Sequence, residues 1–107
     1  MEYKAEVLEK AVDTYGSMNQ TGKAAEELSE LLVALNKWLG VTGDENYENR
    51  IAEFHARYNI REECADVEIM LSQLKIIFGD WSDWTKYKMD RLEGRLNAIN
   101  GTKENDC

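Results

Sequence analysis

No proline occurs in the 107 residues of this chain, and that absence constrains the fold more than any other feature. Proline is the strongest helix breaker, because its ring removes an N–H donor and clashes with the preceding turn. Apolar residues recur at three- and four-residue steps along most of the chain, which is the periodicity of an amphipathic helix. No two segments resemble a pair of strands. We therefore expect an all-α protein of long helices joined by short turns.

Glycines and polar clusters divide the periodic segments into a four-to-five-helix bundle. We expect long helices at about 2–15, 19–39, 60–78 and 83–100, and a shorter one at 47–58. Gly40 stands where a C-terminal cap belongs, and Ser82 could cap the last helix. The length suits one domain, placed at 1–100, with 101–107 as a disordered tail. The segment 60–78 is apolar on several sides, which indicates contact with a second subunit.

Charge and composition argue against several classes of protein. Lys and Arg total 13 and Asp and Glu total 21, which gives a formal net charge of −8. So acidic a chain suits neither a nucleic-acid partner nor an anionic membrane. No apolar run reaches the ~20 residues of a spanning helix, and residues 1–10 lack a signal-peptide core. The only cysteines are Cys64 and Cys107, so we expect no disulfide framework and a cytoplasmic location.

Two acidic pairs stand inside strongly apolar segments. Glu27 and Glu30 are three residues apart, and so are Glu63 and Asp66. This spacing puts both carboxylates of a pair on one helix face, where like charges repel unless a cation lies between them. Four oxygen donors from two packed helices would form a hard-ligand site for Mg²⁺, with Mn²⁺ as a possible substitute.

A solvated acidic helix face is the alternative explanation, and it would suffice for one such pair. The surroundings of these two pairs are apolar: Ala24, Ala25, Leu28, Leu31 and Leu32 around the first, and Cys64, Ala65, Val67 and Ile69 around the second. Pattern alone leaves both explanations open. A di-iron carboxylate bundle is disfavoured, because such sites use Glu-x-x-His pairs and the chain has none.

Residues around these pairs resemble the motifs of the MazG-like nucleoside triphosphate pyrophosphohydrolases. The first motif corresponds to Tyr15-Gly16, Gln20 and 24–31, the second to 62–71, and a following basic segment to 87–96. The resemblance covers about 15–96 and is closest to the small single-domain forms common in bacteriophages. Two features depart from the family pattern. The stretch between Glu30 and Glu63 is long, and Cys64 replaces the usual leucine or isoleucine.

The resemblance implies an all-α bundle that works as a homodimer or a dimer of dimers. It also implies Mg²⁺-dependent hydrolysis of a (deoxy)nucleoside triphosphate to the monophosphate and pyrophosphate, in the host cytoplasm if the protein is phage-encoded. The implied metal ligands are Glu27, Glu30, Glu63 and Asp66. One carboxylate that the metal does not fully occupy could orient the attacking water, and we expect Glu30 to be this catalytic residue. The alternative function is a non-enzymatic, acidic helical interaction or regulatory module.

A basic stripe occupies one face of the last expected helix. Lys88, Arg91 and Arg95 follow one another at three- and four-residue steps. With the resemblance, we expect these side chains to bind the phosphates of the substrate. The alternative is surface pairing with Asp90 and Glu93, which are interleaved with them.

Two residues of the first motif are further candidates for substrate binding. Gln20 lies seven residues before Glu27 and therefore on the same helix face, and Lys23 lies between them. Aromatic side chains could stack on a base, although aromatic residues at helical spacing are more often part of the core. The aromatic residues that could stack on a base are Trp38, Trp81, Trp84 and Tyr87.

Overall fold

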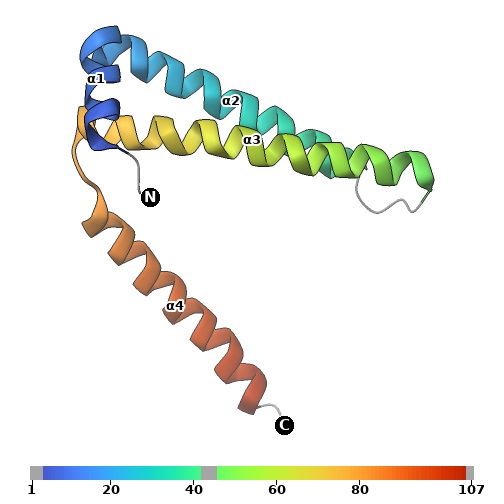
Figure 1. Cartoon of the computed structure of the whole chain (residues 1–107). Coiled ribbons are helices and arrows are strands. Elements are labelled where there is room, and N and C mark those ends of the chain that lie inside the picture. The colour runs from blue at the N-terminus through green and yellow to red at the C-terminus, as the bar shows by residue number, and fades with distance from the viewer. Residues whose placement is uncertain (1–3, 42–45, 106–107) are drawn as a thin grey trace.

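The computed structural model describes residues 4–41 and 46–105, and within these ranges the chain is all-helical, as expected. Its four helices are α1 (Ala5–Tyr15), α2 (Ser17–Val41), α3 (Tyr47–Phe78) and α4 (Ser82–Asn105) (Figure 1). No described helix combines the length and apolarity needed to cross a bilayer.

An antiparallel pair formed by α2 and α3 is the centre of the fold, and α1 packs across one end of it. A sharp turn at Gly16 connects α1 to α2. Its φ of 90° is a conformation that glycine adopts without steric cost, and its N–H donates to the carbonyl of Val12 at 2.8 Å. The small core consists of Val12, Ala24, Ala34, Val67 and Met70.

The helix α3 corrects the expectation of two separate helices at 47–58 and 60–78. It is a single helix of 32 residues. Asn59 does not end it, because neither glycine nor proline occurs in this stretch and the backbone bonds continue. Asn46 caps its start by accepting a hydrogen bond from the Asn49 N–H at 2.8 Å.

Two expected caps are also absent. The helix α2 continues through Gly40 to Val41, so Gly40 is an internal helical residue. The hydroxyl of Ser82 donates to the carboxylate of Asp80 at 2.8 Å instead of accepting a hydrogen bond from the first turn of α4. At the other end, α4 runs to Asn105, so residues 101–105 of the expected tail are helical, and residues 106–107 lie outside the described ranges.

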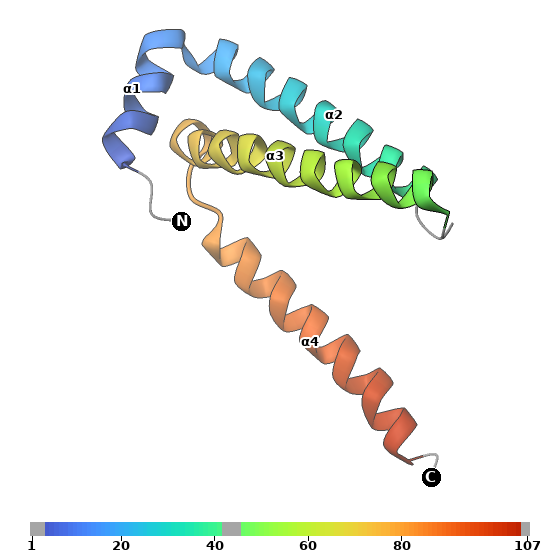
Figure 2. The ribbon, with the colours of Figure 1, turned by 45° about the vertical axis from the view of Figure 1, so that its right-hand side comes forward.

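The helix α4 packs against none of the other described helices. Figures 1 and 2 both show it projecting away from the α2–α3 pair. Within the described part of one chain, the helices therefore do not close into a four-helix bundle. The radius of gyration is 19.0 Å, whereas a compact domain of this length would have about 13 Å.

Candidate metal centre

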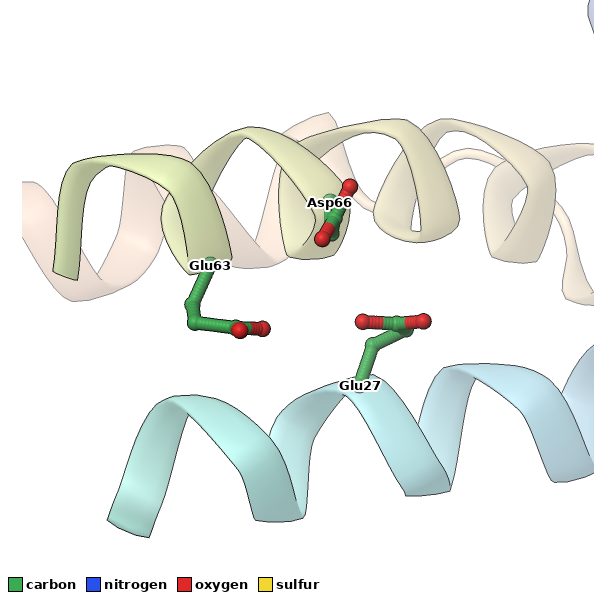
Figure 3. Close-up of side chains that lie close together, drawn as sticks. All are labelled: Glu27, Glu63 and Asp66. Atoms are coloured by element: carbon green, nitrogen blue, oxygen red, sulfur yellow. The ribbon is translucent and has the colours of Figure 1, made fainter. Parts of the chain in front are cut away.

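Glu27 of α2 and Glu63 and Asp66 of α3 converge at the middle of the helix pair. Each offers a carboxylate oxygen, and these three atoms lie within 4.8 Å of one another. Figure 3 shows Glu27 and Glu63 extending into the space between the helices, with Asp66 one turn further along α3. The structure thus brings together three of the four expected metal ligands.

The packing of α2 on α3 explains why these carboxylates meet. Glu27 shares the inner face of α2 with Gln20, Ala24 and Ala34, all of which are buried. The inner face of α3 carries Val67, Met70 and Gln73, and Glu63 begins the same row one turn earlier. Alanine on the α2 side lets the helices approach closely, so the seam that forms the core also encloses the acidic side chains.

Burial leaves part of this acidic cluster without protein partners. Glu27 is only 8% exposed. The Oε2 atoms of Glu27 and Glu63 are buried and accept no hydrogen bond within the described part of the chain. Buried carboxylates are normally paired or bound to a metal, because removing charge from water is costly. The pair of orphaned oxygens therefore fits a divalent cation, and all the donors are the hard oxygen ligands that Mg²⁺ prefers.

Glu30, the fourth expected ligand, is exposed and lies outside the converging group of three. It is nevertheless close enough to be affected by that group. The negative charge of Glu27 is the largest influence, followed by desolvation and the charge of Glu63, and together they raise the pKa of Glu30. A carboxyl group that holds its proton more tightly than usual is suited to accept a proton from water.

Lys23 is the cation that pairs with this cluster. Its Nζ lies 3.2 Å from Oε1 of Glu27 and 3.6 Å from Oε2 of Glu26. The hydrogen bond to Glu27 is the main reason that the pKa of Lys23 is raised. The expected substrate-binding lysine thus contacts the carboxylates directly, and one lysine leaves the cluster with a net negative charge.

Gln20 lies two helical turns from the cluster, where its Nε2 donates to Oε1 of Gln73 at 2.7 Å. Both amides are buried, so this bond connects α2 to α3 inside the seam. Gln73 was not expected from the sequence. A spacing in the sequence could have pointed to it: Gln73 follows Asp66 by seven residues, just as Gln20 precedes Glu27 by seven.

The basic stripe Lys88, Arg91 and Arg95 lies on α4 and is not brought to the carboxylates within one chain (Figure 2). Among the described residues, none of the three forms an ion pair. Asp90 pairs with Lys86 instead, at 3.4 Å. The guanidinium of Arg91 lies 5.8 Å from the centroid of the Tyr87 ring.

An open groove of about 530 Å³ lies between α2 and α3, on the side of the cluster toward the ends at Val41 and Tyr47. Trp38 forms part of its wall and donates from Nε1 to Oε1 of Glu53 at 3.1 Å. The lining residues are Leu35, Trp38, Phe54, Arg57, Tyr58, Ile60 and Arg61. The sequence singled out only Trp38 of these, because the continuity of α3 was needed to place the five lining residues of that helix beside it.

No family model matches this chain, and no curated protein or solved structure matches it significantly. The resemblance to MazG-like enzymes is therefore carried by the sequence motifs alone.

Proposed function

We propose that this protein is a MazG-like nucleoside triphosphate pyrophosphohydrolase that acts in the cytoplasm with Mg²⁺. The convergence of Glu27, Glu63 and Asp66, with two buried oxygens lacking partners, is the observation that supports this proposal most strongly. A solvated acidic face would leave those oxygens hydrated. Here they lie in the seam between two helices, where a cation would relieve both their desolvation and their mutual repulsion.

In this reaction Glu27, Glu63 and Asp66 would hold the metal. When bound, Mg²⁺ supplies Lewis-acid polarisation of the phosphate and lowers the pKa of water. Glu30 orients the attacking water and takes its proton as the water oxygen bonds to the α-phosphorus. The bond from that phosphorus to the α–β bridging oxygen breaks, and pyrophosphate leaves. The raised pKa of Glu30 suits this role, because proton acceptance becomes easier as the pKa rises toward the operating pH.

The groove beside the cluster suits the nucleoside part of such a substrate. Phe54 and Tyr58 line the groove and are exposed, so their rings are available for a base to stack on. Arg61 lines the groove and stands two residues before Glu63 on α3, so the groove adjoins the acidic cluster. The long segment between the two acidic motifs therefore contributes the wall of the groove.

A pyrophosphate-release assay tests the proposal. Purified protein with Mg²⁺ is given each common and modified NTP and dNTP in turn, and pyrophosphate and monophosphate are measured. We expect turnover of at least one nucleotide, lost in Glu63→Gln and retained in Glu62→Gln. Glu62 is the matched control, since it is an exposed glutamate beside Glu63. Absence of turnover across the panel, or equal turnover in Glu63→Gln, would contradict the proposal.

The unpacked surface of α4 favours a second candidate function, an acidic helical module that binds another protein. Several large apolar side chains on α4 are exposed. This alternative gives no role to the orphaned carboxylates. A melting experiment with millimolar Mg²⁺ separates the two functions, because only the enzyme requires a stabilising metal site.

A further inference from the structure

The side chains that line the groove between α2 and α3 offer many hydrogen-bond donors and almost no acceptors. The polar groups among them belong to Trp38, Arg57, Tyr58 and Arg61, and only the hydroxyl of Tyr58 can also accept. The whole chain has a formal net charge of −8, yet the lining contains two arginines and no acidic residue. The groove therefore suits a ligand that presents acceptors, and it disfavours one that presents amino groups.

The guanidinium of Arg57 is held from two sides. Its Nε donates to Oε1 of Glu53, and its central carbon lies 5.8 Å from the centroid of the Trp38 ring. Trp38 donates from Nε1 to the same Oε1 atom at 3.1 Å, so the arrangement connects α2 to α3. The hydrogen bond from Arg57 is the main reason that the pKa of Glu53 is lowered, and the carboxylate therefore stays ionised. Glu53 itself does not line the groove.

The outer edge of this guanidinium is free for a ligand. The side chain of Arg57 is 65% exposed, and within residues 4–41 and 46–105 neither of its Nη groups forms a hydrogen bond or an ion pair. With Nε occupied, the two Nη groups present a pair of N–H donors that point the same way. The matching ligand has two acceptors side by side.

Among the common bases, guanine carries such a pair of acceptors, O6 and N7, and arginine commonly binds both at once. Hypoxanthine has the same two atoms. Adenine keeps N7 but has an amino donor where guanine has O6, so one donor of the protein would face another. Thymine offers only O4 on this edge and cytosine offers an amino group. The free edge of Arg57 therefore favours a 6-oxopurine.

The rest of the groove suits the same ligand. Phe54 and Tyr58 stand one turn apart on α3 on either side of Arg57 in the sequence, and both rings are exposed. Arg61 follows Arg57 by one turn and, in the described part of the chain, forms no ion pair, so it adds positive charge to the same wall. A planar base can stack on a ring while its polar edge meets the guanidinium.

We propose that the groove binds 6-oxopurine bases, with Arg57 donating to O6 and N7, and that it discriminates against adenine. Arg57 is then the residue that determines specificity, and Glu53 is a positioning residue that acts through it. The identification of the bound base as part of the substrate rests on the proposed function. Recognition of the base edge needs neither metal nor hydrolysis.

Calorimetric titrations of the full chain without metal test the recognition. Four nucleoside 5′-monophosphates that share ribose and phosphate are compared: guanylate, inosinate, adenylate and 7-deazaguanylate, which lacks the N7 acceptor. We expect guanylate and inosinate to bind about tenfold more tightly than the other two, since one bidentate contact is worth about that much in discrimination. Equal affinities for all four, tighter binding of adenylate, or no binding of any would overturn the inference.

Arg57→Lys tests the residue itself, because lysine keeps the charge but loses the paired donors. The variant should bind all four monophosphates with similar affinity, and its helical circular dichroism should be unchanged. Arg50→Lys is the matched control, since Arg50 is an exposed arginine of α3 that lines a different groove. It should keep the tenfold preference. A preference that survives in Arg57→Lys would contradict the assignment of Arg57.

Glu53 is tested by loss and rescue. Glu53→Ala removes the acceptor that holds Nε of Arg57, so the preference for guanylate over adenylate should fall severalfold. Glu53→Gln keeps an oxygen at this position and should restore most of the preference. Equal loss in both variants, or no loss in either, would exclude the positioning role.

The pyrophosphate-release assay separates this inference from the proposed function. Selective binding of guanylate by a protein that turns over no nucleotide would overturn the function and leave the groove assignment standing. Turnover of guanine and adenine nucleotides with equal kcat/KM, together with equal affinities for their monophosphates, would overturn the groove assignment and leave the function standing.

Discussion

Glu27 and Glu63 lie on facing helices, and each buries an Oε2 atom that has no hydrogen-bond partner among the described residues. Within the described ranges, the cation that pairs with this cluster is Lys23, which binds the other oxygen of Glu27. Packing α2 against α3 therefore forces two carboxylates together in a place that water reaches poorly. A bound metal ion would relieve the repulsion between these carboxylates, and so would removal of one of their charges. Metal binding and charge removal can be varied separately by experiment.

Mg²⁺ should stabilise the protein, and Glu63→Gln should remove that effect. At ten times its dissociation constant, a ligand that binds only the folded state adds about 1.4 kcal/mol, or roughly 6 °C in a domain of this size. Without metal, the variant should melt at the same temperature as the wild type or higher, because one buried charge is gone. Thermal melts with and without Mg²⁺ measure both effects. Glu62→Gln should keep the full response, and a variant that unfolds while retaining specific activity would refute the assignment of Glu63.

Ionisation of Glu30 should lower the stability of the metal-free protein as the pH rises above about 4.5. The nearby charge of Glu27 raises the pKa of Glu30 from its usual 4.5. The folded protein therefore binds this proton more tightly than the unfolded chain does, so losing the proton destabilises the fold. Urea unfolding at several pH values should show that Glu30→Gln is more stable than the wild type at neutral pH. The difference should disappear below pH 4.5, and a difference that persists there would point to another cause.

Arg91→Ala should slow turnover of every nucleotide by a similar factor, about ten- to a hundredfold, which corresponds to the loss of a charge-assisted hydrogen bond. The order of preference among bases should not change, since phosphates are common to all the substrates. The melting response to Mg²⁺ should survive. Lys86→Ala is the control, because Lys86 lies on the opposite face and pairs with Asp90. A change in base preference would place Arg91 at the base rather than at the phosphates.

Replacing Gln73 by leucine should destabilise the protein by about 1–3 kcal/mol, because the buried amide of Gln20 would lose its acceptor. Replacing both glutamines by leucine should restore most of that loss, since no polar group is then left unpaired. Chemical denaturation of the two single variants and the double variant gives the coupling free energy. Additive losses would show that the 2.7 Å bond contributes little to folding.

Helix content could be predicted from the sequence, because the missing proline and the apolar periodicity are local signals. The continuity of α3 could not, since Asn59 has weak preferences that its neighbours override. The meeting of Glu27 with Glu63 and Asp66 was predicted from two motifs 36 residues apart, counted from Glu27 to Glu63. The outward course of α4 could not be predicted, because hydrophobic periodicity does not encode the backbone geometry of the short turn at 79–81, where Gly79 has a φ of 99°. Periodicity identifies the apolar face of α4 but not the molecule that covers it.

Because α3 is unbroken, it fixes the distance between the groove and the acidic cluster. Tyr58 of the groove and Asp66 of the acidic cluster stand on one unbroken helix, eight residues apart. At 1.5 Å per residue, the span between them is about 12 Å, and it cannot adjust as it could across a hinge. A ligand that binds in the groove and at the acidic cluster at once must therefore have its ring and its charged group separated by a matching distance. Selection by molecular length would then act alongside any recognition of the ring, and ligands with shortened or extended spacers would be rejected even when both of their ends are the right kind.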